Sequence, residues 1–273
     1  MKDKISLAGD LGSGKSTVSK ILIDRLGAEY YATGAIVRSV AERHGMSVVE
    51  LNKYMETHPE IDHEIDDGLK ALSDLDKLLI IDSRMAWHFT RGTFKVYLSI
   101  DIETGALRIM NANREGEHRA TLEETVNDTR ERRASEKRRY MEQYGVDIKD
   151  LSNYSLIVDT TYATPDEIAE IIISSFAEWQ DNRDFALTYI SPSRLNYIDD
   201  EADVPEVNRR ASMLDEGIAI PEVTVFECDG EFYVEDGLES ALAYAFNMDT
   251  FVPARLVKGE CGERKYVKMK NSL

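Results

Sequence analysis

Residues 9 to 16, "GDLGSGKS", have the composition and spacing of a loop that binds phosphate groups. Gly9, Gly14, Lys15 and Ser16 occupy the fixed positions of the pattern G-x-x-x-x-G-K-[ST]. An apolar run at residues 5–8 predicts a buried strand before the loop, and apolar residues at helical spacing predict a helix after it. Such a loop turns backbone N–H groups and the positive end of a helix dipole toward an anion. The sequence therefore predicts a nucleotide phosphate site; an ordinary Gly/Ser turn is the alternative.

We expect this loop to bind ATP together with Mg²⁺. The Lys15 ammonium would reach the β- and γ-phosphates, and the Ser16 hydroxyl would ligate the metal ion. The other loop residues expected to surround the phosphates are Gly9, Gly12, Ser13, Gly14 and Thr17.

The composition of the chain limits the classes of partner. A formal net charge of -18 argues against nucleic acid, whose phosphates would be repelled. No apolar run approaches the ~18 residues of a membrane span. The strand predicted from residue 5 leaves no room for a signal peptide, so we expect a cytoplasmic protein without a membrane partner. Cys228 and Cys261 lack metal-ligand spacing and are expected to be plain thiols.

A basic segment, "RERRASEKRR" at residues 130–139, stands out in this acidic chain because it holds six basic residues and two acids. A solvated helix face is one explanation. The phosphate loop upstream favours another, in which this helix lies beside an anionic ligand.

Strands and helices alternate along the first part of the chain. We expect strands at 5–8, 28–32, 77–83, 94–100 and 155–159, and helices at 15–26, 33–45, 47–55, 59–72, 121–144 and 164–179. This alternation predicts an α/β fold with a doubly wound parallel sheet, in which ligands bind at the carboxyl ends of the strands.

The composition changes at residues 180–186, which are polar and lack apolar periodicity. We therefore expect a first domain at 1–180, a smaller α+β domain at 181–258 and a C-terminal tail at 259–273. Within the smaller domain, Asp229-Gly230 between two alternating runs predicts a type I′ hairpin, followed by a helix at 237–248 and a strand at 251–257.

The first domain resembles the cytidylate kinases, members of the nucleoside-monophosphate kinase group, over about residues 4–178. Besides the phosphate loop, the segments that carry the resemblance are "YYATGAIVRSVAERHGMS", "KYMETHPEIDHEID", "IIDSRMAWHF" and "RERRASEKRRYMEQYGVDIKDLSNYSLIVDT", in this order. The resemblance implies a P-loop fold with a helical acceptor region and a lid, and phosphoryl transfer from ATP to CMP or dCMP.

The resemblance also implies an acceptor site. Arg38 and Arg84 would hold the acceptor phosphate and nucleotide, and guanidinium groups suit this role because they bind phosphate bidentately. Thr33 and Glu136 would face the acceptor ribose or base. Surface ion pairs are the alternative for the arginines, and an i,i+4 pair with Arg132 is the alternative for Glu136.

A second set of residues is implied for the lid, the metal ion and the donor. Arg132 and Arg139 would close with the lid onto the transferring group. Asp82, at the end of a strand, would hold Mg²⁺ through water, with a turn or cap role as the alternative. Arg108 and Arg114, where the lid begins, would contact the donor or form surface ion pairs.

Two departures from the family pattern leave base selectivity open. "DSR" at 82–84 replaces an expected glycine-arginine pair, and Arg133 stands where many relatives have an acid. From the spacing along the helix, Arg133 and Lys137 are expected to point away from the face that carries Arg132 and Arg139.

The smaller domain resembles the ParB/sulfiredoxin-like fold, on the segment "DGEFYVEDGLESALAYA". The arginine that this pattern expects is missing, because Leu238, Glu239 and Ser240 follow Gly237. Residues 181–257 hold 17 acids against five arginines, so DNA binding is not expected. A regulatory or assembly role, with a protein as partner, is the expectation that remains.

Three functions are therefore compatible with the sequence. The leading hypothesis is an ATP-dependent kinase of the nucleoside monophosphates CMP and dCMP. The second is a P-loop kinase for another small acceptor, because the "DSR" change lies near the acceptor site. The third is a nucleotide-gated regulatory binding module without turnover.

Overall fold

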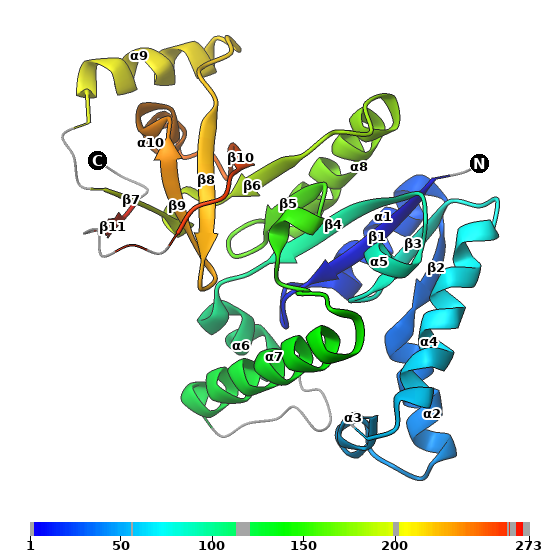
Figure 1. Ribbon diagram of the computed structural model, residues 1–273. Helices are drawn as coiled ribbons and strands as arrows, with labels where there is room; N and C mark the ends of the chain where they lie inside the picture. Colours follow the sequence, from blue (N-terminus) through cyan, green and yellow to red (C-terminus); the bar gives the residue numbers. More distant parts are fainter. Residues whose placement is uncertain are drawn as a thin grey trace.

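The computed structural model describes residues 3–55, 57–112, 121–198, 202–260, 262 and 266–269. Its strands form one mixed sheet in the order β11-β7-β9-β8-β10-β6-β5-β4-β1-β3-β2. Residues up to the end of α8 at Asp181, called the first half below, supply one end of this sheet, and the residues after it, called the second half, supply the other, as Figure 1 shows.

The predicted parallel sheet is confirmed in the first half of the chain. Its strands are β1 (Lys4–Gly9), β2 (Glu29–Ala32), β3 (Leu79–Asp82), β4 (Thr93–Ser99) and β5 (Leu156–Asp159), paired in parallel in the order β2-β3-β1-β4-β5. All five strands therefore end at the same edge of the sheet.

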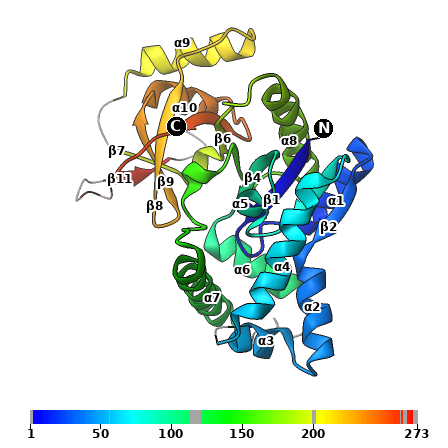
Figure 2. The same ribbon diagram turned by 45° about the vertical axis from the view of Figure 1, so that its right-hand side comes forward.

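Eight helices accompany these strands in the described residues. They are α1 (Lys15–Leu26), α2 (Thr33–Arg43), α3 (Val48–Met55), α4 (Pro59–Ala71), α5 (Ala86–Phe89), α6 (Ile102–Asn111), α7 (Leu122–Tyr144) and α8 (Pro165–Asp181), with short 3₁₀ turns at Leu72–Asp74 and Leu151–Asn153. Figures 1 and 2 both show α6 and α7 beyond the arrowheads of the parallel strands, with α2, α3 and α4 on the flank of β2. Helices α5 and α6 were not predicted from the sequence.

Helices α1 and α8 pack together over one face of the parallel sheet. On β4, Phe94, Val96 and Leu98 point into this core, whereas Tyr97 points to the opposite face. Helix α8 begins at the predicted cap, where Thr164 and Glu167 form a capping box. The opposite face is covered by α2 to α5 near β3, and elsewhere by the second half of the chain.

The second half forms a smaller α+β unit. Its elements are β6 (Leu187–Ile190), a 3₁₀ turn (Pro192–Arg194), β7 (Leu195–Ile198), α9 (Val204–Asp215), β8 (Val223–Cys228), β9 (Glu231–Asp236), α10 (Leu238–Phe246), β10 (Val252–Leu256) and β11 (Tyr266–Lys268). The predicted hairpin joins β8 and β9, with positive φ at Asp229 (52°) and Gly230 (87°).

The two halves share a sheet and a hydrophobic core. Strand β6 pairs in parallel with β5, so the sheet continues past the expected boundary. Ala8, Tyr97 and Ile157 belong to the same buried cluster as Val225 and Ala254 of the smaller unit. The described part of the expected C-terminal tail includes β11, which pairs with β7.

One expectation about the cysteines is wrong. Cys228, at the end of β8, is disulfide-bonded rather than a plain thiol, and Cys261 lies outside the described residues. Spacing could not reveal this, because only the fold decides which cysteines come together. Among the residues that the structure describes, no helix is long and apolar enough to span a membrane.

Candidate functional site

The phosphate loop follows β1 and enters α1 through glycines that no other residue could replace without strain. Gly9, Gly12 and Gly14 have φ values of 151°, 81° and 82°. A Cβ on Gly9 would lie 2.4 Å from the Leu98 carbonyl oxygen, and one on Gly12 would lie 2.4 Å from the Gly105 oxygen. A Cβ on Gly14 would meet nothing within 4 Å. The loop therefore packs tightly on β4 and α6 while its helix side stays open for a ligand.

Lys15 begins α1 and lies half-buried inside the loop. Its Nζ donates hydrogen bonds to the carbonyl oxygens of Gly9 (3.1 Å) and Asp10 (3.2 Å). Burial, followed by the nearby Arg84 guanidinium, lowers the pKa of Lys15 to about 8. In the described chain no side chain caps α1, and its first turn holds no acid. The first N–H groups of this helix are thus available to an anion.

The carboxyl ends of the neighbouring strands β2 and β3 lie beside the loop. Asp82 ends β3, and its Oδ2 accepts a hydrogen bond from the Tyr30 hydroxyl (3.2 Å). Burial and this carboxylate raise the pKa of Tyr30 to about 12. Thr33, at the start of α2, donates from Oγ1 to the Asp82 carbonyl oxygen (3.4 Å). Ser16 and Thr17 are exposed on the first turn of α1.

Two of the predicted arginines meet on one carboxylate. Arg84, just after β3, pairs through Nε with Glu136 of α7 at 2.7 Å. Arg132, one turn earlier on α7, pairs with the other Glu136 oxygen at 3.2 Å. Burial would lower the pKa of Arg84, but the Glu136 carboxylate outweighs it and the pKa is raised. The i,i+4 alternative for Glu136 is thus realised, together with a bridge from α7 to the end of β3.

Asp10, the second residue of the loop, is the centre of another charged group. Its carboxylate accepts hydrogen bonds from the Tyr97 hydroxyl (2.7 Å), the Ile100 N–H (3.2 Å) and the Lys149 ammonium. Arg133 Nη2 lies 3.3 Å from Oδ1. Burial alone would raise the pKa of Asp10, but Lys149, Arg133 and the hydrogen bonds outweigh it and lower the pKa to about 2.

Arg139 has a different environment from Arg132. Its Nη2 donates to the hydroxyl of the adjacent Tyr140 (3.2 Å). One helical turn further, Gln143 donates to Asp62 of α4 at 3.0 Å. This half of α7 therefore packs on α4. Arg139 is not among the described residues that line the pocket between the two charged groups, which is described at the end of this subsection.

The remaining predicted arginines lie outside this group. Arg38 is exposed on α2. Arg108 donates from Nη2 to the carbonyl oxygens of Thr160 (2.8 Å) and Thr161 (3.2 Å), in the turn after β5. Arg114 lies outside the described residues.

The expected orientation of Arg133 is wrong. It faces the phosphate loop, because it lies three residues before Glu136 on the same side of α7, a spacing that could have revealed it. Lys137 does point away and pairs with Asp147 at 2.8 Å. Asp10 and Lys149 were not predicted from the sequence as site residues. No motif marks Lys149, which reaches the loop from the chain after α7.

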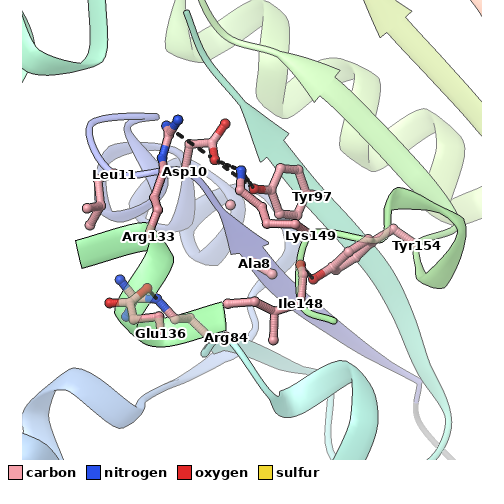
Figure 3. Close-up of a pocket in the computed structure, with 11 residues that line it drawn as sticks. Ala8, Asp10, Leu11, Arg84, Tyr97, Arg133, Glu136, Ile148, Lys149 and Tyr154 are labelled. Atoms are coloured by element: carbon pink, nitrogen blue, oxygen red, sulfur yellow. Dashed lines mark hydrogen bonds and ion pairs between the residues drawn. The ribbon is translucent and has the colours of Figure 1, made fainter. Parts of the chain in front are cut away.

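A pocket opens between these two charged groups (Figure 3). It is lined by Ala8, Gly9, Asp10, Leu11, Arg84, Tyr97, Arg133, Glu136, Ile148, Lys149 and Tyr154. The pocket thus joins the phosphate loop, the end of β3, α7 and the chain after α7, and its walls carry more cations than carboxylates.

Comparison with known proteins agrees with this arrangement. A cytidylate kinase of Thermoplasma volcanium is 36% identical over 64% of this chain and 92% of its own length, and one of Sulfurisphaera tokodaii is 38% identical over 62% and 92%. An S-adenosylmethionine-dependent nucleotide dehydratase of Lacinutrix mariniflava is 34% identical over 64% of this chain but 36% of its own length. Residues 4–162 match the family described as "Cytidylate kinase-like family". The chain therefore belongs to the cytidylate kinase-like family.

Proposed function

We propose that the protein transfers the γ-phosphoryl group of ATP to CMP or dCMP. The observation that carries the proposal is the placement of Lys15 after β1, of Asp82 at the end of the adjacent strand β3, and of the pair formed by Arg84 and Glu136 just beyond that strand. These charges act on one another, since Arg84, Asp82 and Glu136 all perturb the pKa of Lys15. Phosphoryl transfer needs such a group because catalysis consists mainly of positioning two anions and neutralising charge.

The residues present fit ATP with Mg²⁺. The uncapped start of α1 and the open space beside Gly14 can receive phosphate oxygens. Ser16 offers an exposed hydroxyl and Asp82 a half-buried carboxylate, and hard oxygen ligands of this kind suit Mg²⁺. When bound, the ion neutralises negative charge on the β- and γ-phosphates.

The remaining steps belong to the side chains. Lys15 would leave the loop carbonyls and bind the β- and γ-phosphates, with Gly12, Ser13 and Thr17 around them. An acceptor phosphate oxygen forms the new bond to the γ-phosphorus as the bond to the bridging oxygen breaks, which gives ADP and a nucleoside diphosphate. Arg132 would stabilise the transferring charge.

The acceptor would enter beside Arg84. Thr33 and Arg38 on α2 would approach it from the opposite side, and Arg139 would join only if α7 moves relative to α4. Arg108 would act on the donor site indirectly, by holding the turn after β5 through its hydrogen bonds. We propose that Arg114 also contributes to binding of the donor.

An ADP-release assay with ATP, Mg²⁺ and a panel of acceptors tests this function directly. CMP and dCMP should support turnover above UMP and AMP. Turnover with another small acceptor alone would establish a different P-loop kinase. ATP binding without turnover on any acceptor would contradict the kinase and favour a nucleotide-gated module.

We also propose that residues 181–258 form a ParB/sulfiredoxin-like unit with a regulatory or assembly role. Its strongly acidic composition and its exposed apolar side chains, Phe246 and Met248 among them, suit a protein partner rather than nucleic acid. Binding of a defined partner should change kcat or KM for the acceptor, whereas an unchanged rate would contradict regulation.

A further inference from the structure

The turn after β5 joins the second half of the chain to the first turn of α6. Arg194, in the 3₁₀ turn after β6, is buried, and its Nη1 donates to the Thr161 hydroxyl at 3.2 Å. The Thr161 hydroxyl donates to Asp159 Oδ1 at 2.5 Å and accepts from the Asp101 N–H at 3.0 Å. A threonine hydroxyl has one proton to donate and two lone pairs, so every bonding position of this group is used. The end of β5, the turn that holds Arg194 and the start of α6 therefore meet at one buried oxygen atom.

Further hydrogen bonds hold this turn from both sides. Arg194 Nη2 donates to the carbonyl oxygen of Gly230 (2.7 Å), at the tip of the β8–β9 hairpin, which Figure 1 shows pointing toward α6 and α7. On the other side, Arg108 of α6 donates to the carbonyl oxygens of Thr160 and Thr161. The smaller unit and α6 thus fix the same turn.

The first turn of α6 is also the surface against which the phosphate loop packs. Asp101 caps this turn, since its carboxylate accepts hydrogen bonds from the N–H (2.8 Å) and the hydroxyl (2.9 Å) of Thr104. A Cβ on Gly12 would lie 2.4 Å from the Gly105 oxygen, and a Cβ on Gly105 would lie 2.8 Å from the Leu11 oxygen. The two backbones are therefore in direct contact, and a displacement of this turn would displace the loop.

The charge of Arg194 also reaches the cap of α6. Burial alone would raise the pKa of the Asp101 carboxyl, and the hydrogen bonds from Thr104 oppose this effect. The charges of Arg194 and Lys268 lower the pKa further, so that it lies below its ordinary value. Both cations belong to the second half of the chain. The smaller unit therefore favours the ionised form of the carboxylate that caps α6.

We propose that Arg194 is a positioning residue for the phosphate loop, which acts through the Thr161 hydroxyl and the first turn of α6. This inference rests on the proposed function, because it takes ATP as the ligand of the loop. A loop that is held in its binding geometry before ATP arrives loses less conformational freedom on binding. Its N–H groups contact phosphates in the ground state and in the transition state alike, so a loosened loop should raise the Kd and KM for ATP more than it lowers kcat. The smaller unit thereby sets the affinity of the site for ATP without touching the nucleotide.

Thr161→Val tests the inference, because it removes the shared hydroxyl and leaves Arg194 able to pair directly with Asp159. We would measure calorimetric binding of ATP with Mg²⁺ but without an acceptor, steady-state kinetics, and hydrogen exchange of residues 9–14 and 101–105 without nucleotide. The variant should weaken ATP binding by about 10-fold, because small displacements of binding groups have large effects. Exchange should be faster in both segments. The kcat and the KM for CMP should change by less than about threefold.

Thr90→Val is the matched control for this variant. Thr90 is equally buried, but its hydroxyl donates to the Leu69 carbonyl oxygen (2.8 Å), before β4 and away from α6. Its substitution should leave the Kd for ATP unchanged.

Arg194→Met should raise the Kd for ATP by a factor similar to that of Thr161→Val. Combining the two substitutions should add little, because the two residues act through one bond. Arg210→Met is the control for lost stability, since Arg210 is also largely buried but bonds Glu206 and Ser240 within the smaller unit. A merely structural role lowers the fraction of folded protein, which lowers the apparent kcat and leaves the KM for ATP unchanged.

An unchanged Kd for ATP in Thr161→Val would overturn the inference, even if Arg194→Met does not fold. Equal increases in Thr90→Val or Arg210→Met, or additive effects of Arg194→Met and Thr161→Val, would overturn it as well. Wild-type protein that binds ATP but phosphorylates no acceptor would contradict the proposed function, and the ratio of the Kd values would still decide this inference. Absence of ATP binding by the wild type would overturn both.

Discussion

The two halves of the sheet use charged residues in opposite ways. At the carboxyl edge of the parallel strands, charged side chains with little exposure face one another across a pocket, with Asp10 at 7% and Glu136 at 17%. In the smaller unit, ion pairs such as Arg255 with Glu222 lie on the surface, where both side chains are more than half exposed. Among its described residues, Arg194 is the only buried charged side chain.

Buried charges lower the stability of the fold unless they are paired, whereas exposed charges affect it little. Burying an ion requires compensation by a partner, whereas exposed pairs contribute only about 0–1 kcal/mol. The first half accepts that cost where a nucleotide would bind. In the smaller unit the fully buried case is Arg194, which pairs with Asp159 at the end of β5 and so adds a charged contact to the sheet and core that the halves share.

The largest effect is expected from Lys15→Ala. Loss of the ammonium should lower kcat/KM by about 10³-fold, because charge on the transferring group is no longer neutralised. The fold should remain, since the hydrogen bonds of Lys15 to other described residues go to loop carbonyls alone. Steady-state kinetics and circular dichroism check both statements. Near wild-type turnover would show that this edge of the sheet is not the catalytic one.

Arg194→Met tests how much the stability of the fold depends on the ion pair between Arg194 of the second half and Asp159 of the first. The substitution leaves the fully buried Asp159 without its cation and removes hydrogen bonds to Thr161 and the Gly230 carbonyl oxygen. We expect the free energy of unfolding to fall by about 3–5 kcal/mol. Urea denaturation measures the loss. The surface control Arg255→Met should cost less than about 1 kcal/mol, and equal losses would erase the contrast between the halves.

Arg132→Ala sharpens the assignment within the first half. Because Arg132 shares Glu136 with Arg84, its loss should lower kcat by about 10²-fold and also free Glu136 to pair with Arg84 alone. ATP binding, measured by calorimetry, should change less than kcat, since the contact would form mainly in the closed state. Lys137→Ala is the control, because Lys137 lies on the same helix but pairs with Asp147. A similar loss in both variants would mean that α7 acts only through its packing.

We expect the smallest effect from Asp10→Asn, and we expect this effect to depend on pH. The pKa of Asp10 is lowered to about 2, so its ionised form stabilises the fold above the ordinary pKa of 3.8, and this contribution is lost as the pH falls toward 2. At neutral pH we expect a loss of about 2 kcal/mol in unfolding free energy. Acid titration of the melting temperature should be flatter in the variant between pH 4 and 2. If the melting temperature of the variant falls between pH 4 and 2 as steeply as that of the wild type, Asp10 is not the source of this acid sensitivity.

Much of the first half could be predicted from the sequence, because its strands are apolar runs and its helices begin at local signals such as the cap at Thr164. The resemblance placed Arg84 and Glu136 at one acceptor site, but nothing in the sequence predicted the ion pair between them. The position of Lys149 could not be predicted, because no local pattern says where a chain turns after a long helix. The continuation of the sheet into β6 was equally inaccessible, since pairing between distant strands leaves no mark in composition.

The shared sheet has a consequence for how the protein is made. During synthesis the first half emerges from the ribosome before β6 does, so β5 is then an edge strand and Tyr97 and Ile157 have no cover from the smaller unit. We therefore expect chains that end before residue 187 to be cleaved by protease faster than the full chain, and to bind the hydrophobic dye ANS. Equal resistance would show that the first half matures alone. Otherwise, the kinase site becomes complete only when β8 and β10, which are translated after it, have covered the sheet face opposite α1.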